Sequence, residues 1–186
     1  EPLPEPARGW LAEAQAATAE IDPDKPKIML AARGRYQAEY AVDLAKRRSA
    51  TLVVIYVRTL RVMDPGAAQS QRIEDDAAAQ EALGSVVVLA KANGVAVMPI
   101  YVTSTEIAEE ILDYTVTYGC DTLIMGKSRR SLLSRRLEGD VVADVAASLP
   151  EEVAMITRSG GTPHRHGLVI PETSVEKAVD RGADDA

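Results

Sequence analysis

Along the chain, segments with the hydrophobic pattern of β-strands alternate with segments in which apolar residues recur at helical spacing. This alternation predicts five strands separated by helices. Three apolar runs predict strands at Lys27–Ala32, Thr51–Val57 and Thr122–Met125. The run at Thr51–Val57 is continuously apolar and β-branched, which is typical of a strand buried on both faces. Two further strands are expected at Val95–Val102 and Glu152–Thr157.

Helical spacing of apolar residues fills the intervals between these strands. The expected helices are Tyr36–Arg48, about Gln71 to Asn93, a helix that starts at a capping box of Thr103 and Glu106 and ends near Gly119, and Asp140–Leu149. Regular alternation of strand and helix predicts an α/β fold with a parallel, doubly wound sheet. Pro99 cannot donate to a ladder, so we expect the third strand at a sheet edge.

The folded domain is expected to span 26–158, with a lead-in at 1–25 and a flexible tail at 159–186. In the lead-in, Trp10, Leu11, Ala14 and Ile21 can share one helical face. Two interpretations stay open: a short helix packed on the domain, or a connector to a missing N-terminal partner. Because the chain begins with Glu1 rather than Met, we expect a processed product or a piece of a longer protein. A short strand is considered at Leu168–Ile170.

Composition narrows the function classes. The net charge of −7 argues against general binding to nucleic acids or anionic membranes. No run of 18 apolar residues is present, and the acidic, proline-rich start does not resemble a signal peptide. The single cysteine, Cys120, excludes an internal disulfide, fits a reducing compartment and is expected to be buried and inert.

A basic loop after the fourth predicted strand opposes this acidic background. Between Gly126 and Gly139 the basic residues are Lys127, Arg129, Arg130, Arg135 and Arg136, and no acid precedes Glu138. A strand, glycine, loop, glycine and helix in succession present backbone N–H groups and a helix N-terminus to an anion. Two interpretations stay open: an anion site, or exposed cations that pair with the acidic remainder of the domain.

Other chemistry is not supported by the sequence. A P-loop would need glycine at position 121, which is Asp121, and His164 and His166 alone are too few for a metal site. The acidic pairs Asp75-Asp76 and Glu109-Glu110 are expected on solvated helix faces. No nucleophile–base pairing or metal cluster is visible, so we expect neither catalysis nor a bound metal.

With the elements placed, residues 26–158 resemble a universal stress protein domain. The stretches that carry the resemblance are KIMLAARG, TLVVIYV and IMGKSRRSLLSRRLEGDVVADV. The resemblance implies the sheet order 3-2-1-4-5 and a ligand crevice between strands one and four, where the order reverses. It also implies a homodimer formed by pairing of the fifth strands, here 152–157.

The resemblance also implies which residues would hold a nucleotide. Gly126 and Gly139 match the outer glycines of the family's ATP motif, whereas Arg129 replaces its middle glycine and Asp140 its Ser or Thr. The Asp140 carboxylate would repel phosphate, although aspartate is also a good helix N-cap. The implied nucleotide-binding residues are Arg33, Gly34, Val57, Gly126, Lys127, Arg129, Arg130, Gly139, Asp140 and Val141.

The expected function is a non-catalytic regulatory or stress-response domain that binds ATP, AMP or cyclic di-AMP in this crevice. The wording GKSRRSLL followed by GDVV resembles stress-protein-like domains fused after amino-acid permease-type transporters. This implies a cytoplasmic domain that regulates a transporter and is tethered at the inner membrane through a missing N-terminal region. The alternative is a dimerising interaction domain with a degenerate motif that binds no nucleotide. An ATP-hydrolysing enzyme ranks last.

Overall fold

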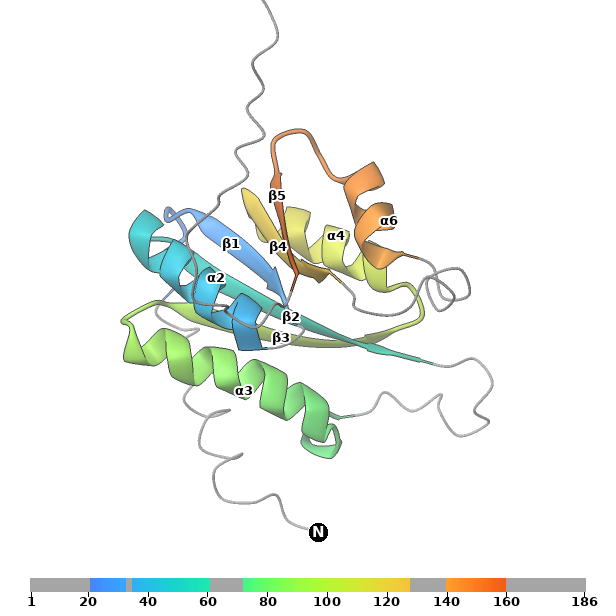
Figure 1. The fold of residues 1–186 in the computed structure, drawn as a ribbon, viewed down its shortest axis with the longest axis horizontal. Helices are drawn as coiled ribbons and strands as arrows, with labels where there is room; N and C mark the ends of the chain where they lie inside the picture. The colour runs from blue at the N-terminus through green and yellow to red at the C-terminus, as the bar shows by residue number, and fades with distance from the viewer. Residues whose placement is uncertain (1–20, 33–34, 61–71, 128–139, 160–186) are drawn as a thin grey trace, which may run out of the picture.

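The five strands form one parallel sheet. The structure, a computed structural model, describes residues 21–32, 35–60, 72–127 and 140–159. In chain order the strands are β1 Lys27–Ala31, β2 Thr51–Thr59, β3 Val97–Ser104, β4 Thr122–Lys127 and β5 Ala154–Ser159. Their order in the sheet is β3-β2-β1-β4-β5, and all pairs are parallel (Figure 1). The predicted sheet order is confirmed, and so is the edge position of the strand that carries Pro99.

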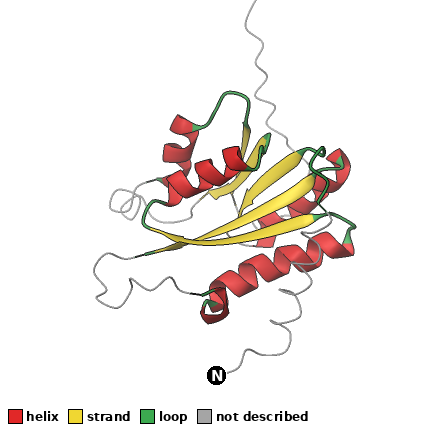
Figure 2. Cartoon of the chain, turned by 180° about the vertical axis from the view of Figure 1, so that it is seen from behind, coloured by secondary structure: helices red, strands yellow, loops and turns green. Residues whose placement is uncertain are grey.

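Helices cover both faces of this sheet. They are α2 Arg35–Arg48, the short 3-10 helix η1 Ile73–Asp75, α3 Ala77–Ala92, α4 Ile107–Thr117 and α6 Val141–Ser148. Helices α2 and α3 pack on one face, and α4 and α6 on the other (Figure 2). The predicted doubly wound α/β fold is therefore confirmed. No helix within the described ranges is long and apolar enough to cross a membrane.

The core divides into two clusters because successive side chains of a strand point to opposite faces of the sheet. Ile28 and Leu30 of β1 pack under α2 and α3, whereas Met29 and Ala31 of the same strand pack under α4 and α6. Cys120 belongs to the second cluster and is 3% exposed. Burial raises the pKa of its thiol to about 12. The predicted burial of this cysteine is confirmed, and its low reactivity stays a prediction.

Two predicted helix starts are wrong. The long helix begins at Ala77 rather than near Gln71, because the Asp76 side chain accepts a hydrogen bond from Ala79 N at 3.0 Å and caps it. The predicted capping box is absent: Thr103 lies inside β3, and Glu106 occupies the N-cap of α4 without a side-chain hydrogen bond.

The fifth strand is Ala154–Ser159 rather than Glu152–Thr157. A turn precedes it, in which Val153 N donates to Pro150 O at 3.0 Å, so Glu152 belongs to that turn. The other predicted strands begin or end within two residues of their observed bounds. The expected helix at 10–21, the strand at 168–170 and the tail lie wholly or almost wholly outside the described residues.

Candidate functional site

The sheet contains one switch point, between β1 and β4. The two strands are neighbours, with Leu30 opposite Ile124, yet β1 leads onward to β2 on one side and β4 to β5 on the other. In open α/β sheets, ligands bind outside the carboxyl ends of the strands at such a point. The predicted location of the site therefore exists in the topology.

Helices α2, α3, α4 and α6 all begin at the carboxyl end of the sheet, and two of them, α2 and α6, follow the strands that flank the switch point. Helix α2 starts at Arg35, shortly after β1 ends, and α6 starts at Val141, after β4 and the loop that follows it. Each helix returns the chain to the amino end, so its N-terminus lies at the carboxyl end of the strands, and α2 and α6 cover opposite faces. A helix N-terminus carries partial positive charge and unpaired N–H groups, which favour an anion.

Gly126 borders a cation that the sequence analysis did not single out. It pairs with Arg158 of β5, and the Arg158 guanidinium carbon lies 4.1 Å from the centre of the Tyr40 ring of α2. Ile124 and Ile156 belong to the α2/α3 core, so Gly126 and Arg158, two residues further on, face the same side. Because Gly126 has no side chain, Arg158 reaches across β4 to Tyr40. One cation is thereby held beside the switch point.

Val57 and Val141, both predicted to contact the nucleotide, pack against the same core cluster under α4 and α6. Val57 lies two residues beyond Ile55, which pairs with the last residue of β1. Lys127 ends β4 opposite Ser159. The structure therefore brings Val57, Gly126, Lys127 and Val141 to the carboxyl end of the sheet. Five predicted site residues lie outside the described part of the chain: Arg33, Gly34, Arg129, Arg130 and Gly139.

Asp140 occupies the N-cap position of α6 but does not cap it. Its backbone has the extended conformation of a cap, with φ −106° and ψ 89°, yet its side chain makes no capping hydrogen bond. The expectation that helix capping explains this aspartate is therefore wrong. Its half-buried carboxylate lies at the helix end where the family motif would place a phosphate-binding hydroxyl.

Asp76 corrects a second expectation. It was predicted on a solvated helix face, but its side chain is 1% exposed and forms a salt bridge with Arg58 at 2.9 Å. Tyr101 Oη also donates to it at 3.0 Å. Burial alone would raise the pKa of Asp76, but the hydrogen bonds from Ala79 N, Arg58 and Tyr101 outweigh it and lower the pKa. The sequence signal was an aspartate directly before an alanine-rich helix.

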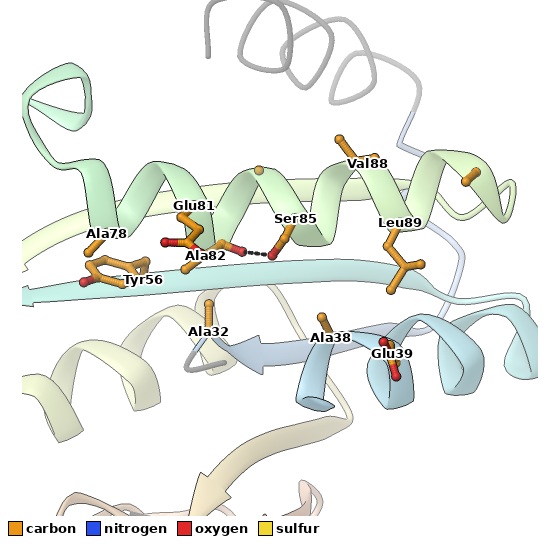
Figure 3. Close-up of a pocket in the computed structure, with 12 residues that line it drawn as sticks. Ala32, Ala38, Glu39, Tyr56, Ala78, Glu81, Ala82, Ser85, Val88 and Leu89 are labelled. Carbon is orange, nitrogen blue, oxygen red and sulfur yellow. Dashed lines mark hydrogen bonds between the residues drawn. The ribbon is translucent and has the colours of Figure 1, made fainter. Parts of the chain in front are cut away.

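A groove between α2 and α3 runs along one face of the sheet and ends beside the switch point. It has a volume of about 760 Å³ and reaches Ala32 and Tyr56 at the carboxyl end of the sheet (Figure 3). It opens on the α2/α3 face, and residues 33–34 and 128–139 lie outside the described part of the chain. Among the residues that the structure describes, no group of three or more His, Cys, Asp or Glu side chains is placed to hold a metal.

Comparison with known proteins agrees with this architecture. A family model described as the universal stress protein family matches residues 31–157, more than half of the chain. A search of curated proteins gives no match.

Several solved structures have the same fold. A universal stress protein from Archaeoglobus fulgidus in complex with dAMP has 18% identity and a TM-score of 0.52, covering 73% of this chain and 98% of its own. A universal stress protein in complex with cAMP has 19% identity and a TM-score of 0.55, covering 72% and 97%. UspA from Lactobacillus plantarum has 18% identity and a TM-score of 0.52, covering 72% and 97%. At these identities the similarity establishes the fold.

Proposed function

The chain belongs to the universal stress protein family, and on this premise we propose that it is a non-catalytic regulatory domain that binds an adenine nucleotide at the β1/β4 switch point. The observation that carries the proposal is the meeting of two helix N-termini and one positioned cation at that point. Helices α2 and α6 begin there, and Arg158 is held over Tyr40 beside Gly126. All three features stabilise negative charge, and phosphate is the anion that nucleotides supply.

The ligand class is ATP, AMP or cyclic di-AMP. Two solved members of the family hold adenine nucleotides, dAMP and cAMP, which supports adenine as the base. Val57, at the end of β2, is the described residue that we assign to the base, and the N–H groups of α6 after Asp140 are assigned to phosphate. Lys127 and the basic loop residues Arg129 and Arg130 would add positive charge, as would Arg33 before α2.

A thermal-shift titration of the whole chain with ATP, AMP, cyclic di-AMP and, as a base control, GTP tests this proposal. A ligand at ~100 times its Kd that binds only the folded state adds about 2.7 kcal/mol, which corresponds to several degrees of Tm. We expect a shift with at least one adenine nucleotide and a smaller shift with GTP. If no adenine nucleotide raises the Tm, the proposed function is wrong.

Two arginines make a matched pair for locating the phosphate. Arg158→Ala removes the cation beside Gly126 and is expected to weaken binding roughly tenfold, the value of one hydrogen bond to a charged group. Arg47→Ala removes an equal charge from the last turn of α2, at the other end of the sheet, where Arg47 pairs with Asp43 at 3.0 Å. Equal effects of the two substitutions would mean that Arg158 is not near the phosphate.

We propose further, from the family resemblance, that two copies pair through β5 and that the domain regulates an amino-acid permease-type transporter from the cytoplasmic side. In support of pairing, β5 is an edge strand of the sheet, whereas Pro99 removes one N–H group from the other edge strand, β3. Sedimentation equilibrium should then give twice the mass of the 19.9 kDa chain.

Incubation with ATP should release no phosphate above the buffer rate, in keeping with a non-catalytic domain.

The second candidate function is a dimerising interaction domain that binds no nucleotide. The observation that favours it is Asp140, whose carboxylate adds negative charge at the N-terminus of α6. This candidate predicts a stable dimer and a Tm that does not respond to any adenine nucleotide, so the titration above separates the two functions.

A further inference from the structure

The groove between α2 and α3, which we call the α2/α3 groove, is not used by the proposed nucleotide site. Its α3 wall includes Ala78, Ala82, Ser85, Leu89 and Ala92, which recur at helical intervals, together with Glu81, Gly84 and Val88. Figure 3 shows Leu89 pointing from α3 toward α2, and Ala78 close to the Tyr56 ring. Small side chains along one helix let a second helix approach closely, since interaxial distance depends on the side chains at the contact.

This surface exposes apolar area to water. Val88 borders the groove and is 60% exposed, one of two large hydrophobic residues in the described ranges that are exposed to this degree. Covering apolar surface stabilises a protein by about 25 cal/mol per Å². The groove is largely apolar, with Glu39 and Glu81 as its charged lining residues, and such a surface next to an exposed valine favours a covering segment.

The lead-in enters the domain at one end of the groove. Residues 22–26 lead into β1, whose Lys27 Nζ donates to Pro23 O at 2.8 Å. This is the amino end of the sheet, and α3 ends there too, because Leu52 N bonds Ala96 O just after the helix. Residue 21 is thus placed at the same end of the sheet as Ala92, the last lining residue of α3.

The segment from Trp10 to Ile21 has the length and pattern to fill the groove. As a helix its 12 residues would span about 18 Å, and the distance along α3 from Ala78 to Ala92 is about 21 Å. Its apolar residues Trp10, Leu11, Ala14 and Ile21 share one face, and its glutamates fall outside that face. The tail is a poorer occupant, because it follows Ser159 of β5. That residue lies at the carboxyl end of the sheet and on the edge strand opposite β3.

We propose that residues 10–21 dock as an amphipathic helix into the α2/α3 groove of their own chain. Ile21 would lie near Ala92, and Trp10 toward Ala78 and Tyr56. The lead-in is then part of the domain surface, and it covers the face on which α2 and α3 lie. The proposal does not depend on nucleotide binding.

Fluorescence of the intact chain tests this docking directly, because Trp10 is the single tryptophan. In the native chain we expect its emission to be blue-shifted relative to a free tryptophan amide and shielded from acrylamide. Val88→Asp places a charge at the groove and should shift the emission to the red and increase quenching. Val116→Asp is the matched control, because Val116 is 57% exposed but lies on α4, on the opposite face of the sheet.

A second variant keeps the test independent of one site. Ser85→Arg fills the middle of the groove from an exposed position on α3 and should release Trp10 as Val88→Asp does. Three results would overturn the proposal. The first is that Trp10 of the native chain is quenched as freely as the amide. The second is that the shielding of Trp10 disappears on dilution, which would assign the groove to a second copy. The third is that Val116→Asp releases Trp10 as much as Val88→Asp does.

Discussion

In the described part of the chain, two aspartates occupy the N-cap position of a helix, and one of the two caps its helix. Asp76 precedes α3 with φ −110° and ψ 88°, and Asp140 precedes α6 with φ −106° and ψ 89°. The backbones are nearly identical, so the difference lies in the side chains. Asp76 accepts hydrogen bonds from Ala79 N and Tyr101 and pairs with Arg58, whereas Asp140 makes no capping bond.

This difference separates a structural residue from a candidate functional one. The Asp76 carboxylate joins the start of α3 to the ends of β2 and β3, and its burial makes those bonds necessary, because an unpaired buried charge is costly. The Asp140 carboxylate does not cap its helix, and it lies at the helix end nearest the proposed phosphate. The predictions below test whether the two aspartates differ as much in solution as they do in geometry.

The largest effect is expected from Asp76→Ala. The substitution removes a helix cap, a salt bridge and a hydrogen bond, and it leaves Tyr101 Oη without its acceptor. Arg58 is 38% exposed, so water can hydrate its guanidinium once Asp76 is removed. We therefore expect the free energy of unfolding to fall by about 2–3 kcal/mol rather than by the full cost of a buried charge. Chemical denaturation measures this loss of unfolding free energy. Thermal denaturation should show a fall in Tm of about 2–4 °C per kcal/mol.

Acid denaturation of the native chain provides the control for that result. The folded pKa of Asp76 lies below its ordinary value of 3.8, so its contribution is present above that value and is lost as pH falls through the lower, folded pKa. The Asp76→Ala chain should lose less stability than the native chain over this acidic range. Parallel losses in both chains would mean that the Asp76 bonds do not stabilise the fold.

A smaller effect is expected from Tyr101→Phe, which removes one of the hydrogen bonds to Asp76 and keeps the ring. Tyr101 stacks on Tyr56 with ring centres 6.2 Å apart, so packing is retained and the loss should be about 1 kcal/mol. Denaturation at neutral pH measures this loss.

Burial, and then the bond to Asp76, raise the pKa of Tyr101 to about 12, so the contribution of the Tyr101 hydroxyl to stability should vanish between about pH 10 and 12. An unchanged alkaline limb in Tyr101→Phe would contradict this role.

The sheet could be predicted from the sequence because the residue pattern of each strand reflects the burial of both of its faces. Met29 and Leu30, adjacent in β1, enter different clusters, and such a continuous apolar run has few explanations other than a buried parallel strand. Interactions between distant residues were not predictable in this way. The stacking of Arg158 on Tyr40 depends on the register of β5 against Gly126, which no local pattern records.

The aspartates show the same limit. A local signal suffices to name an N-cap position, and Asp140 was expected to cap its helix, but the further partners that hold Asp76 in place come from β2 and β3. The site residues were predicted as a set because the family resemblance supplies them together. Of these, the described residues lie at the expected end of the sheet. Their contacts with a ligand stay a prediction.

The smallest change in stability is expected from Asp140→Ser, and this variant tests the comparison most closely. Serine is an equally good N-cap, and the carboxylate makes no capping bond, so the free energy of unfolding should change by less than about 0.5 kcal/mol. Removal of its charge next to the proposed phosphate should strengthen nucleotide binding by about 1 kcal/mol, roughly fivefold in Kd, as measured by calorimetric titration. Asp144→Ser removes the same charge one turn further into α6 and should strengthen binding less. If Asp140→Ser instead destabilises the chain as Asp76→Ala does, both aspartates are structural, and the phosphate must bind elsewhere.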